Sequence, residues 1–354
     1  MNIQDYGFYG QVTPENNIGI PARVTAVHRD SFAIVCDQGS GLAQVKRGEY
    51  YKGSEDFPTT GDFVLLDWQE HNASRIIKTL PRKTYFARLD PSSSGQNEQA
   101  VAANFDYVFI IQSLERDFNL RRLERYLTLA WQSGATPVVI LTKADCVEDY
   151  YVHVRAAEQL AIGVDVLAVS ANTGLGLEQL DKYLQPRKTL VFLGSSGVGK
   201  STLLNKLAGR DIMNTGKVRD NDGRGRHTTS HRQLILLDSG VMIIDTPGMR
   251  ELGMWDVSEG LEQSFADVEQ YLGQCKFSDC RHQSEPGCAV RNAISRGQLA
   301  QERWESYLRL NAEARFSSDK AGYLREKQQW HKEISKKIKA MQTPSYQHTT
   351  TRHG

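Results

Sequence analysis

The sequence lacks a long hydrophobic run, a leader-like start and a net charge of either sign. None of its 354 residues belongs to an uninterrupted apolar run of about 18, the length that a membrane-spanning helix needs. The first ten residues carry no basic region followed by an apolar stretch. Lys and Arg number 43 against 42 Asp and Glu, which excludes a wholly basic nucleic-acid binder. We therefore expect a cytoplasmic protein with no membrane partner, acting as a monomer.

Cysteine is also scarce. The chain has five cysteines, an odd number, and three of them fall within residues 275–288 beside a histidine. Disulfide frameworks are typical of small secreted chains with paired cysteines, so a metal site explains this cluster better. Cys36 and Cys146 stand apart, and we expect both to be buried thiols.

The composition that remains is that of a globular protein with two or three domains, since 40% of residues are hydrophobic and 24% charged. Charge is placed unevenly. From residue 301 onward there are eleven Lys and Arg against six acids, mostly in stretches with helical spacing. This end is either a contact for an anion such as RNA or a solvated helix face. Beyond Met341 we expect disorder.

Residues 20–80 contain five short β-rich runs separated by Gly, Asp, Ser and Pro turns. Five strands in about 60 residues predict a small closed barrel of the OB-fold type, which often binds nucleic acid. The segment D-P-S-S-S-G-Q-N-E-Q, residues 90–99, has the composition of a linker. From about residue 105, apolar strands alternate with helical stretches, which predicts an α/β domain with a mostly parallel sheet.

A phosphate-binding loop follows the strand T-L-V-F-L. Residues 194–201 read G-S-S-G-V-G-K-S and lead into the helical T-L-L-N-K-L-A. The glycines let backbone amides surround a β-phosphate, and the helix N-terminus adds positive potential. Lys200 should stabilise the β- and γ-phosphates, and Ser201 should bind Mg²⁺. The expected nucleotide contacts here are Gly194, Ser195, Ser196, Gly197, Val198, Gly199, Lys200, Ser201 and Thr202.

Two further segments fit a nucleotide switch. D-T-P-G at residues 245–248 ends an apolar strand, so Asp245 can support the Mg²⁺ shell and the Gly248 amide can sense a γ-phosphate. Alone, this pattern is more typical of a plain turn, but it follows the phosphate-binding loop at the spacing of a nucleotide switch. Between it and the phosphate-binding loop lies the glycine-rich R-D-N-D-G-R-G-R-H-T-T-S, expected to be mobile. Thr229, or its neighbour Thr228, is the candidate second Mg²⁺ ligand, unless this loop has no such role.

Base recognition is expected at T-K-A-D, residues 142–145, and at S-A-N, residues 170–172, each of which follows an apolar strand. The Asp145 carboxylate can accept hydrogen bonds from N1–H and the exocyclic amine of guanine, which adenine does not offer. Lys143 would pack its stem on the base. Carboxyl ends of strands are where α/β proteins bind ligands. The expected guanine contacts are Thr142, Lys143, Ala144, Asp145, Ser170 and Ala171.

The order of these motifs is T-K-A-D, S-A-N, phosphate loop, H-T-T, D-T-P-G, whereas ordinary GTPases run from the phosphate loop to N-K-x-D and S-A. The chain therefore resembles the ribosome-small-subunit-dependent GTPase A family, the circularly permuted GTPases that help mature the bacterial 30S subunit. The resemblance covers about residues 20–315. One departure is Thr142, where that family usually has asparagine, which we expect to loosen the support of the base loop.

The cysteine cluster is C-K-F-S-D-C-R-H-Q-S-E-P-G-C. Three thiolates and an imidazole form a closed tetrahedral zinc site, which replaces a hydrophobic core in a small loop-rich module. The same zinc pattern belongs to the resembled family, and a structural role is favoured over a catalytic one. The expected ligands of one zinc are Cys275, Cys280, His282 and Cys288.

The expected architecture is multidomain. It comprises an OB-fold-like barrel and linker at residues 1–95, a circularly permuted P-loop GTPase domain at 100–262, a helical zinc-binding domain at 263–340 and a disordered tail at 341–354. The resemblance implies a Mg²⁺-dependent GTPase that binds GTP and GDP, the 30S subunit and 16S rRNA, with activity stimulated by the subunit. The alternatives are a zinc-containing RNA-binding protein with a non-hydrolysing nucleotide switch, and an ATP-dependent nucleic-acid enzyme.

The attacking water needs a polar partner. Conventional GTPases place a glutamine after the glycine of D-x-x-G, but this chain has Met249 there. Hydrolysis by the free protein should therefore be slow. His227, just before the two threonines, is the nearest catalytic candidate, because a neutral imidazole can accept a hydrogen bond from water. A ribosomal group is the alternative.

Overall fold

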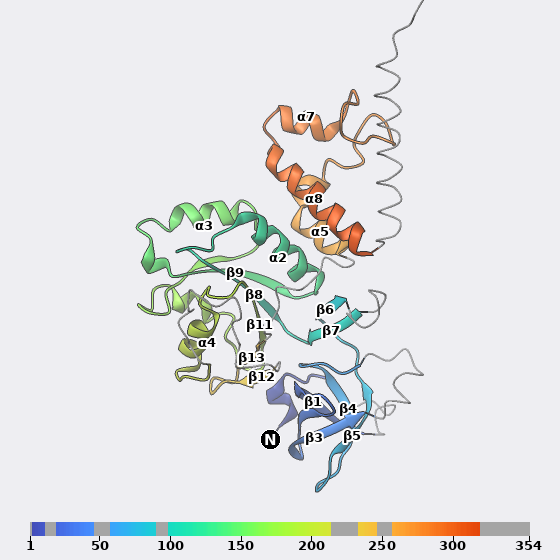
Figure 1. The fold of residues 1–354 in the computed structure, drawn as a ribbon, viewed down its shortest axis with the longest axis vertical. Helices are drawn as coiled ribbons and strands as arrows, with labels where there is room; N and C mark the ends of the chain where they lie inside the picture. The colour runs from blue at the N-terminus through green and yellow to red at the C-terminus, as the bar shows by residue number, and fades with distance from the viewer. Residues whose placement is uncertain are drawn as a thin grey trace, which may run out of the picture.

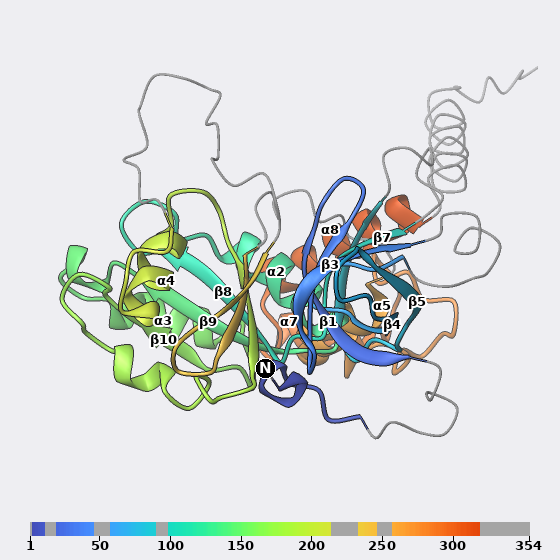
Figure 2. The same cartoon turned by 90° about the horizontal axis from the view of Figure 1, so that it is seen from below.

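The structure is a computed structural model that describes residues 2–10, 19–45, 57–89, 98–213, 233–245 and 257–318. A β-barrel lies at one end of its long axis, an α/β sheet in the middle and a helical unit at the other end (Figure 1). Seen from below, the sheet with its helices and the barrel lie side by side (Figure 2). Within the described ranges, no helix combines the length and the apolar character needed to span a bilayer.

The N-terminal barrel is closed, as predicted. β1 pairs with both β2 and β4, while β3 and β5 form a parallel pair that completes the circle. Alternate apolar residues such as Val24, Ile34 and Leu66 fill its interior. A 3₁₀ helix, η1 (Ile3–Tyr6), lies beside β1. The barrel strands are β1 (Ile20–Val27), β2 (Phe32–Cys36), β3 (Gly39–Val45), β4 (Phe63–Asp67) and β5 (Ser74–Thr79).

A central sheet follows, and it is mostly parallel, as predicted. The order is β10-β9-β8-β11-β13-β12, and only β12 runs antiparallel to its neighbour in this series. β12 also pairs with barrel strand β1 at Gln233 and Ala26, which makes barrel and sheet continuous. Its strands are β8 (Tyr107–Ser113), β9 (Thr136–Thr142), β10 (Val166–Ala168), β11 (Thr189–Leu193), β12 (Gln233–Leu236) and β13 (Met242–Asp245).

A short hairpin joins the barrel to the sheet. It consists of β6 (Tyr85–Leu89) and β7 (Glu98–Ala103). Its presence corrects the expectation of a linker over residues 90–99, because 98 and 99 already belong to β7. Pairing with β6 outweighs the turn-like composition there, since strand hydrogen bonds depend on a partner strand and not on local composition alone. Residues 90–97 lie outside the described part of the chain.

Helices cover both faces of the sheet. One apolar core forms against α2 and α3, and a second forms on the opposite face against α4. The helices are α2 (Leu120–Gln132), α3 (Tyr151–Glu158), α4 (Lys200–Ala208), α5 (Ser258–Ser264), α6 (Ala266–Glu269), α7 (Ala289–Ser295) and α8 (Gln301–Ser318), with short 3₁₀ helices η4 (Ala144–Cys146) and η5 (Leu177–Leu180).

Arg23 of β1 joins the barrel to its neighbours. Its guanidinium is buried and donates hydrogen bonds to the carbonyl oxygens of Tyr6, Gly61 and Asn104 and to the Met242 sulfur. Burial lowers the pKa of Arg23 to about 10, so the group remains charged at neutral pH. Because these partners come from the N-terminal segment, the barrel, the hairpin end and β13, one side chain fixes four segments together.

A second buried arginine, Arg303 of α8, joins the helical unit to the sheet domain. It donates to Glu124 of α2 at 2.8 Å and to Asp267 of α6, and its guanidinium lies 4.0 Å from the centre of the Phe265 ring. α5 also packs closely on α2, since a Cβ on Gly260 would lie 2.2 Å from the Thr128 carbonyl oxygen. The expected domain boundary at residue 262 falls within α5, and the basic end beyond residue 318 lies outside the described ranges.

Candidate nucleotide-binding site

The candidate site lies at the carboxyl edge of the parallel strands. Register places Leu193 at the end of β11 opposite Ile110 of β8, and Ser113 at the end of β8 opposite Thr142 of β9. The loops that leave these strands therefore start at the same edge of the sheet. They include the base loop (residues 142–145) and the P-loop (residues 194–201), which are distant in sequence. The sequence predicted the base loop at the carboxyl end of a strand, where α/β proteins bind ligands.

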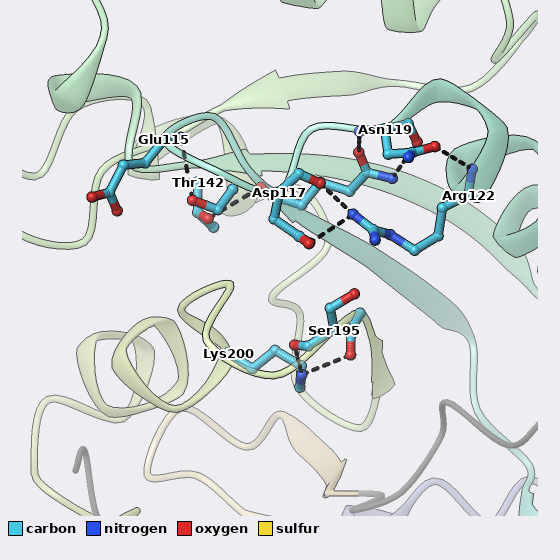
Figure 3. Close-up of polar contacts among 10 residues, drawn as sticks. Glu115, Asp117, Asn119, Arg122, Thr142, Ser195 and Lys200 are labelled. Atoms are coloured by element: carbon cyan, nitrogen blue, oxygen red, sulfur yellow. Dashed lines mark hydrogen bonds and ion pairs between the residues drawn. The ribbon is translucent and has the colours of Figure 1, made fainter. Parts of the chain in front are cut away.

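The P-loop has the backbone geometry that its glycines allow. Gly199 has φ +96°, a left-handed conformation that favours glycine. Gly194 passes so close to β8 that a Cβ would lie 2.4 Å from the Ile111 carbonyl oxygen. Lys200 begins α4, and its Nζ donates to the carbonyl oxygens of Gly194 at 2.7 Å and Ser195 at 2.5 Å (Figure 3). The ammonium is thus held inside the loop where phosphates are expected.

Thr142 connects the base loop to the P-loop. Its side chain is buried, and Oγ1 lies 2.6 Å from the Val198 carbonyl oxygen and 3.1 Å from that of Gln112. A hydroxyl carries one proton, whereas the amide of the asparagine expected here carries two. Replacing asparagine by threonine therefore reduces the number of protons but keeps a direct contact between the two loops.

The rest of the base loop is held from both sides. The Ala144 amide donates to the Val169 carbonyl oxygen, which places the loop beside the S-A-N segment. Asp145 is exposed in η4. Lys143 has φ +58°, and its Nζ lies 2.8 Å from Oε2 of Glu115, a residue that sequence reasoning missed. The hydrogen bond from Lys143 holds the pKa of the Glu115 carboxyl below its usual value.

The S-A-N segment is bent back on itself. The Ser170 amide donates to the Leu175 carbonyl oxygen, and its buried hydroxyl accepts from the Thr173 amide. The Ser170 amide is thus already engaged within the turn. The expected base contact is therefore assigned to the next amide, that of Ala171.

The two cysteines outside the cluster differ in exposure. Cys36 is buried in β2, as expected, but Cys146 is exposed, which corrects the prediction of a buried thiol. Its position in the turn after Asp145, at the edge of the sheet, explains that exposure.

Asp245 is the last residue of β13. The remaining candidates lie outside the described residues; they are His227, Thr228, Thr229 and Gly248.

The cysteine cluster has the geometry of a metal site. The sulfur and Nδ1 atoms all lie within 4.8 Å of one another in Cys275, Cys280, His282 and Cys288. Zn–S bonds of about 2.3 Å in a tetrahedron place two sulfurs about 3.8 Å apart, and Cys275 and Cys288 have their sulfurs 3.9 Å apart. His282 Nδ1 lies 3.4 Å from each of those sulfurs. These residues can hold one zinc.

Glu285 orders the loop between the last two ligands. Its carboxylate accepts hydrogen bonds from the backbone amides of Arg281 at 3.1 Å and of Gln283 and Ser284 at 2.9 Å. Backbone amides, its own first and then that of Ser284, lower the pKa of Glu285 to about 2. The Glu285 carboxylate is therefore charged near neutral pH, and its hydrogen bonds to the backbone amides hold the loop in this conformation.

The arrangement defines a circularly permuted P-loop GTPase, because the base loop precedes the P-loop in the chain but meets it in space. Comparisons with known proteins agree. Residues 79–255 match the RsgA GTPase family. A small ribosomal subunit biogenesis GTPase RsgA 2 from Listeria monocytogenes is 44% identical over 326 residues, 90% of this chain and 91% of the relative.

Solved structures give the same answer. YjeQ from Thermotoga maritima is 27% identical, with a TM-score of 0.60 over 83% of this chain and 97% of that chain. YloQ, described as a circularly permuted GTPase, is 24% identical with a TM-score of 0.56 over 85% and 96%, and supports the fold. This chain belongs to the RsgA GTPase family and is a GTP-hydrolysing P-loop enzyme.

Thr142→Val tests the contact between the two loops. Valine keeps the shape but leaves the buried Val198 carbonyl oxygen without its donor, at a cost of about 1–3 kcal/mol. We expect GDP affinity to fall by about tenfold, the equivalent of about 1.4 kcal/mol, when measured by fluorescent-nucleotide titration. Thr142→Ser keeps the hydroxyl and should bind GDP as the wild type does. Equal affinity for the valine variant would show that this hydrogen bond does not support the site.

Removal of a ligand tests the metal centre. We expect about one zinc per chain by elemental analysis after dialysis, and a loss of bound zinc in Cys280→Ser. Cys146→Ser changes an exposed thiol outside the cluster and should keep the metal. Zinc-free wild-type protein, purified without chelator, would contradict this assignment.

Proposed function

We propose that this GTPase acts in the maturation of the small ribosomal subunit, binding 16S rRNA and hydrolysing GTP faster when the 30S subunit is present. The observation that carries the nucleotide chemistry is the meeting of the base loop and P-loop through Thr142 and Val198. The relative from Listeria is named for small-subunit biogenesis. Since that work takes place on ribosomal precursors, the proposed location is the cytoplasm.

The proposed nucleotide contacts follow the two loops. P-loop amides and Lys200 bind the β- and γ-phosphates, and Asp145 reads the Watson–Crick edge of guanine while the Ala171 amide donates to its O6. Ser201 and Thr229 bind Mg²⁺, with Asp245 supporting its shell and the Gly248 amide contacting the γ-phosphate. When bound by these residues, Mg²⁺ would supply charge neutralisation at the phosphates. Thr202, next along in α4, completes the phosphate contacts.

The flanking units supply the proposed RNA contacts. The barrel (within residues 1–95) and the basic end of the zinc-binding unit (within 263–340) face rRNA, and the GTPase domain (within 100–262) lies between them. The zinc has a structural role, because four protein ligands leave it no open position. A zinc-containing RNA-binding protein with a non-hydrolysing switch would show no phosphate release with 30S subunits, whereas we expect release to rise well above that of the free protein.

Asp145→Asn tests base recognition. The amide cannot accept both guanine protons but can pair with the xanthine edge, so we expect preference to change from GTP to XTP. Competition titrations with GTP, XTP and ATP measure this change. A wild-type protein that binds ATP as tightly as GTP would refute the guanine assignment.

His227 is the proposed group that orients the attacking water, because Met249 offers a thioether in place of a polar side chain. His227→Ala should lose most 30S-stimulated turnover while it keeps GTP affinity, the pattern of an interaction made only in the transition state. If the variant, saturated with 30S subunits, turns over GTP at the wild-type rate, a ribosomal group orients the water instead.

A further inference from the structure

Glu115 lies in a loop that is built against the base loop. This loop follows β8, at the same sheet edge as the end of β9. The Leu114 amide donates to the Thr142 carbonyl oxygen at 3.0 Å, and the Glu115 amide donates to the buried Ser113 hydroxyl at 3.3 Å. The backbone leading into Glu115 is therefore fixed both to the base loop and to the end of β8. Figure 3 shows Glu115 next to Thr142, the last residue of β9.

Lys143, which forms an ion pair with the Glu115 carboxylate, has an unusual backbone conformation. Its φ of +58° is rare for a residue other than glycine, and such residues gather at ligand sites. The preceding residue, Thr142, is fixed to the P-loop because its Oγ1 lies 2.6 Å from the Val198 carbonyl oxygen. The Nζ of Lys143 lies 2.8 Å from Oε2 of Glu115. Both the backbone and the ammonium of Lys143 are thus fixed, and the hydrocarbon stem runs between two fixed points.

We infer that Glu115 is a positioning residue for base binding: its carboxylate holds the Lys143 ammonium so that the lysine stem presents a ready-made apolar surface to the face of the purine. This inference rests on the proposed guanine site. The cost of ordering a long flexible side chain is then met before the nucleotide arrives. Glu115 itself touches neither the base nor the phosphates in this arrangement.

The inference predicts an effect of opposite sign to simple electrostatics. GDP is an anion, so removal of a nearby negative charge should strengthen its binding or leave it unchanged. If Glu115 positions Lys143, removal of its charge must weaken binding instead. Glu148 is the matched control, because it is an exposed acid three residues after Asp145 in the same region.

The experiment compares Glu115→Gln with Glu148→Gln in the full-length protein, using fluorescent-nucleotide competition with GDP and inosine diphosphate. The Lys143 stem contacts the face of any purine, whereas Asp145 also reads the exocyclic amine that inosine lacks. Glu115→Gln should weaken both nucleotides by the same factor, about two- to fivefold as for an exposed ion pair. Glu148→Gln should leave both affinities unchanged or slightly tighter.

A double-mutant cycle isolates the pair. Lys143→Met keeps an apolar stem without the ammonium, and adding Glu115→Gln to it should produce no further loss. Thermal midpoints of the two Glu115 variants should match those of their parents, since the pair is exposed. Unchanged or tighter GDP binding by Glu115→Gln, or full additivity in the cycle, would overturn the inference. A wild-type protein that does not prefer GDP to ADP would instead overturn the proposed guanine site.

Discussion

In the proposed nucleotide site, the constraint on which the rest depends is the hydrogen bond between Thr142 Oγ1 and the Val198 carbonyl oxygen, because it joins the base loop to the P-loop. In a permuted chain, the base loop and the P-loop are separated by about fifty residues, and no local interaction brings them together. The parallel sheet places both at one edge, but a sheet edge is wide enough for neighbouring loops to miss each other. A buried hydroxyl that joins them fixes one loop relative to the other before a nucleotide binds, which reduces the cost of ordering the site.

Two buried arginines join the larger units of the molecule by hydrogen bonds, as Thr142 joins the two loops. Arg23 joins the barrel to β13, and Arg303 joins the helical unit to α2. Each donates to several partners from different segments, so that loss of the side chain would leave buried acceptors unsatisfied at about 1–3 kcal/mol each. An exposed ion pair is worth about 0–1 kcal/mol by comparison. The interfaces between the units are therefore specified by polar groups that fit only one arrangement.

This arrangement gives β13 a particular importance. It ends at Asp245, where the switch sequence D-T-P-G starts, and its Met242 touches Arg23 of the barrel. Its antiparallel neighbour β12 pairs with β1. The strands next to the expected switch segments are thus also the strands that contact the barrel, so the proposed site and the proposed RNA-binding unit are joined by a short physical route.

Much of the molecule could be predicted from the sequence alone. Apolar runs and turn residues gave the five barrel strands and the six sheet strands, because these patterns depend on local spacing. The P-loop and the cluster of three cysteines and a histidine could be recognised because their chemistry requires particular residues at short intervals. The resemblance to a known family explained the unusual order of the motifs.

Other features were decided only by the tertiary structure. The partner of Thr142 and the contact of Glu115 with Lys143 depend on segments distant in the chain. The exposure of Cys146 and the strand at residues 98 and 99 depend on how the chain packs and pairs there, which composition does not record. An acid directly after an apolar strand was a signal for Glu115, but many such acids are solvated. Sequence patterns record which face of an element is apolar, whereas the partner of a polar group is fixed only when the packed backbone brings donor and acceptor within hydrogen-bonding distance.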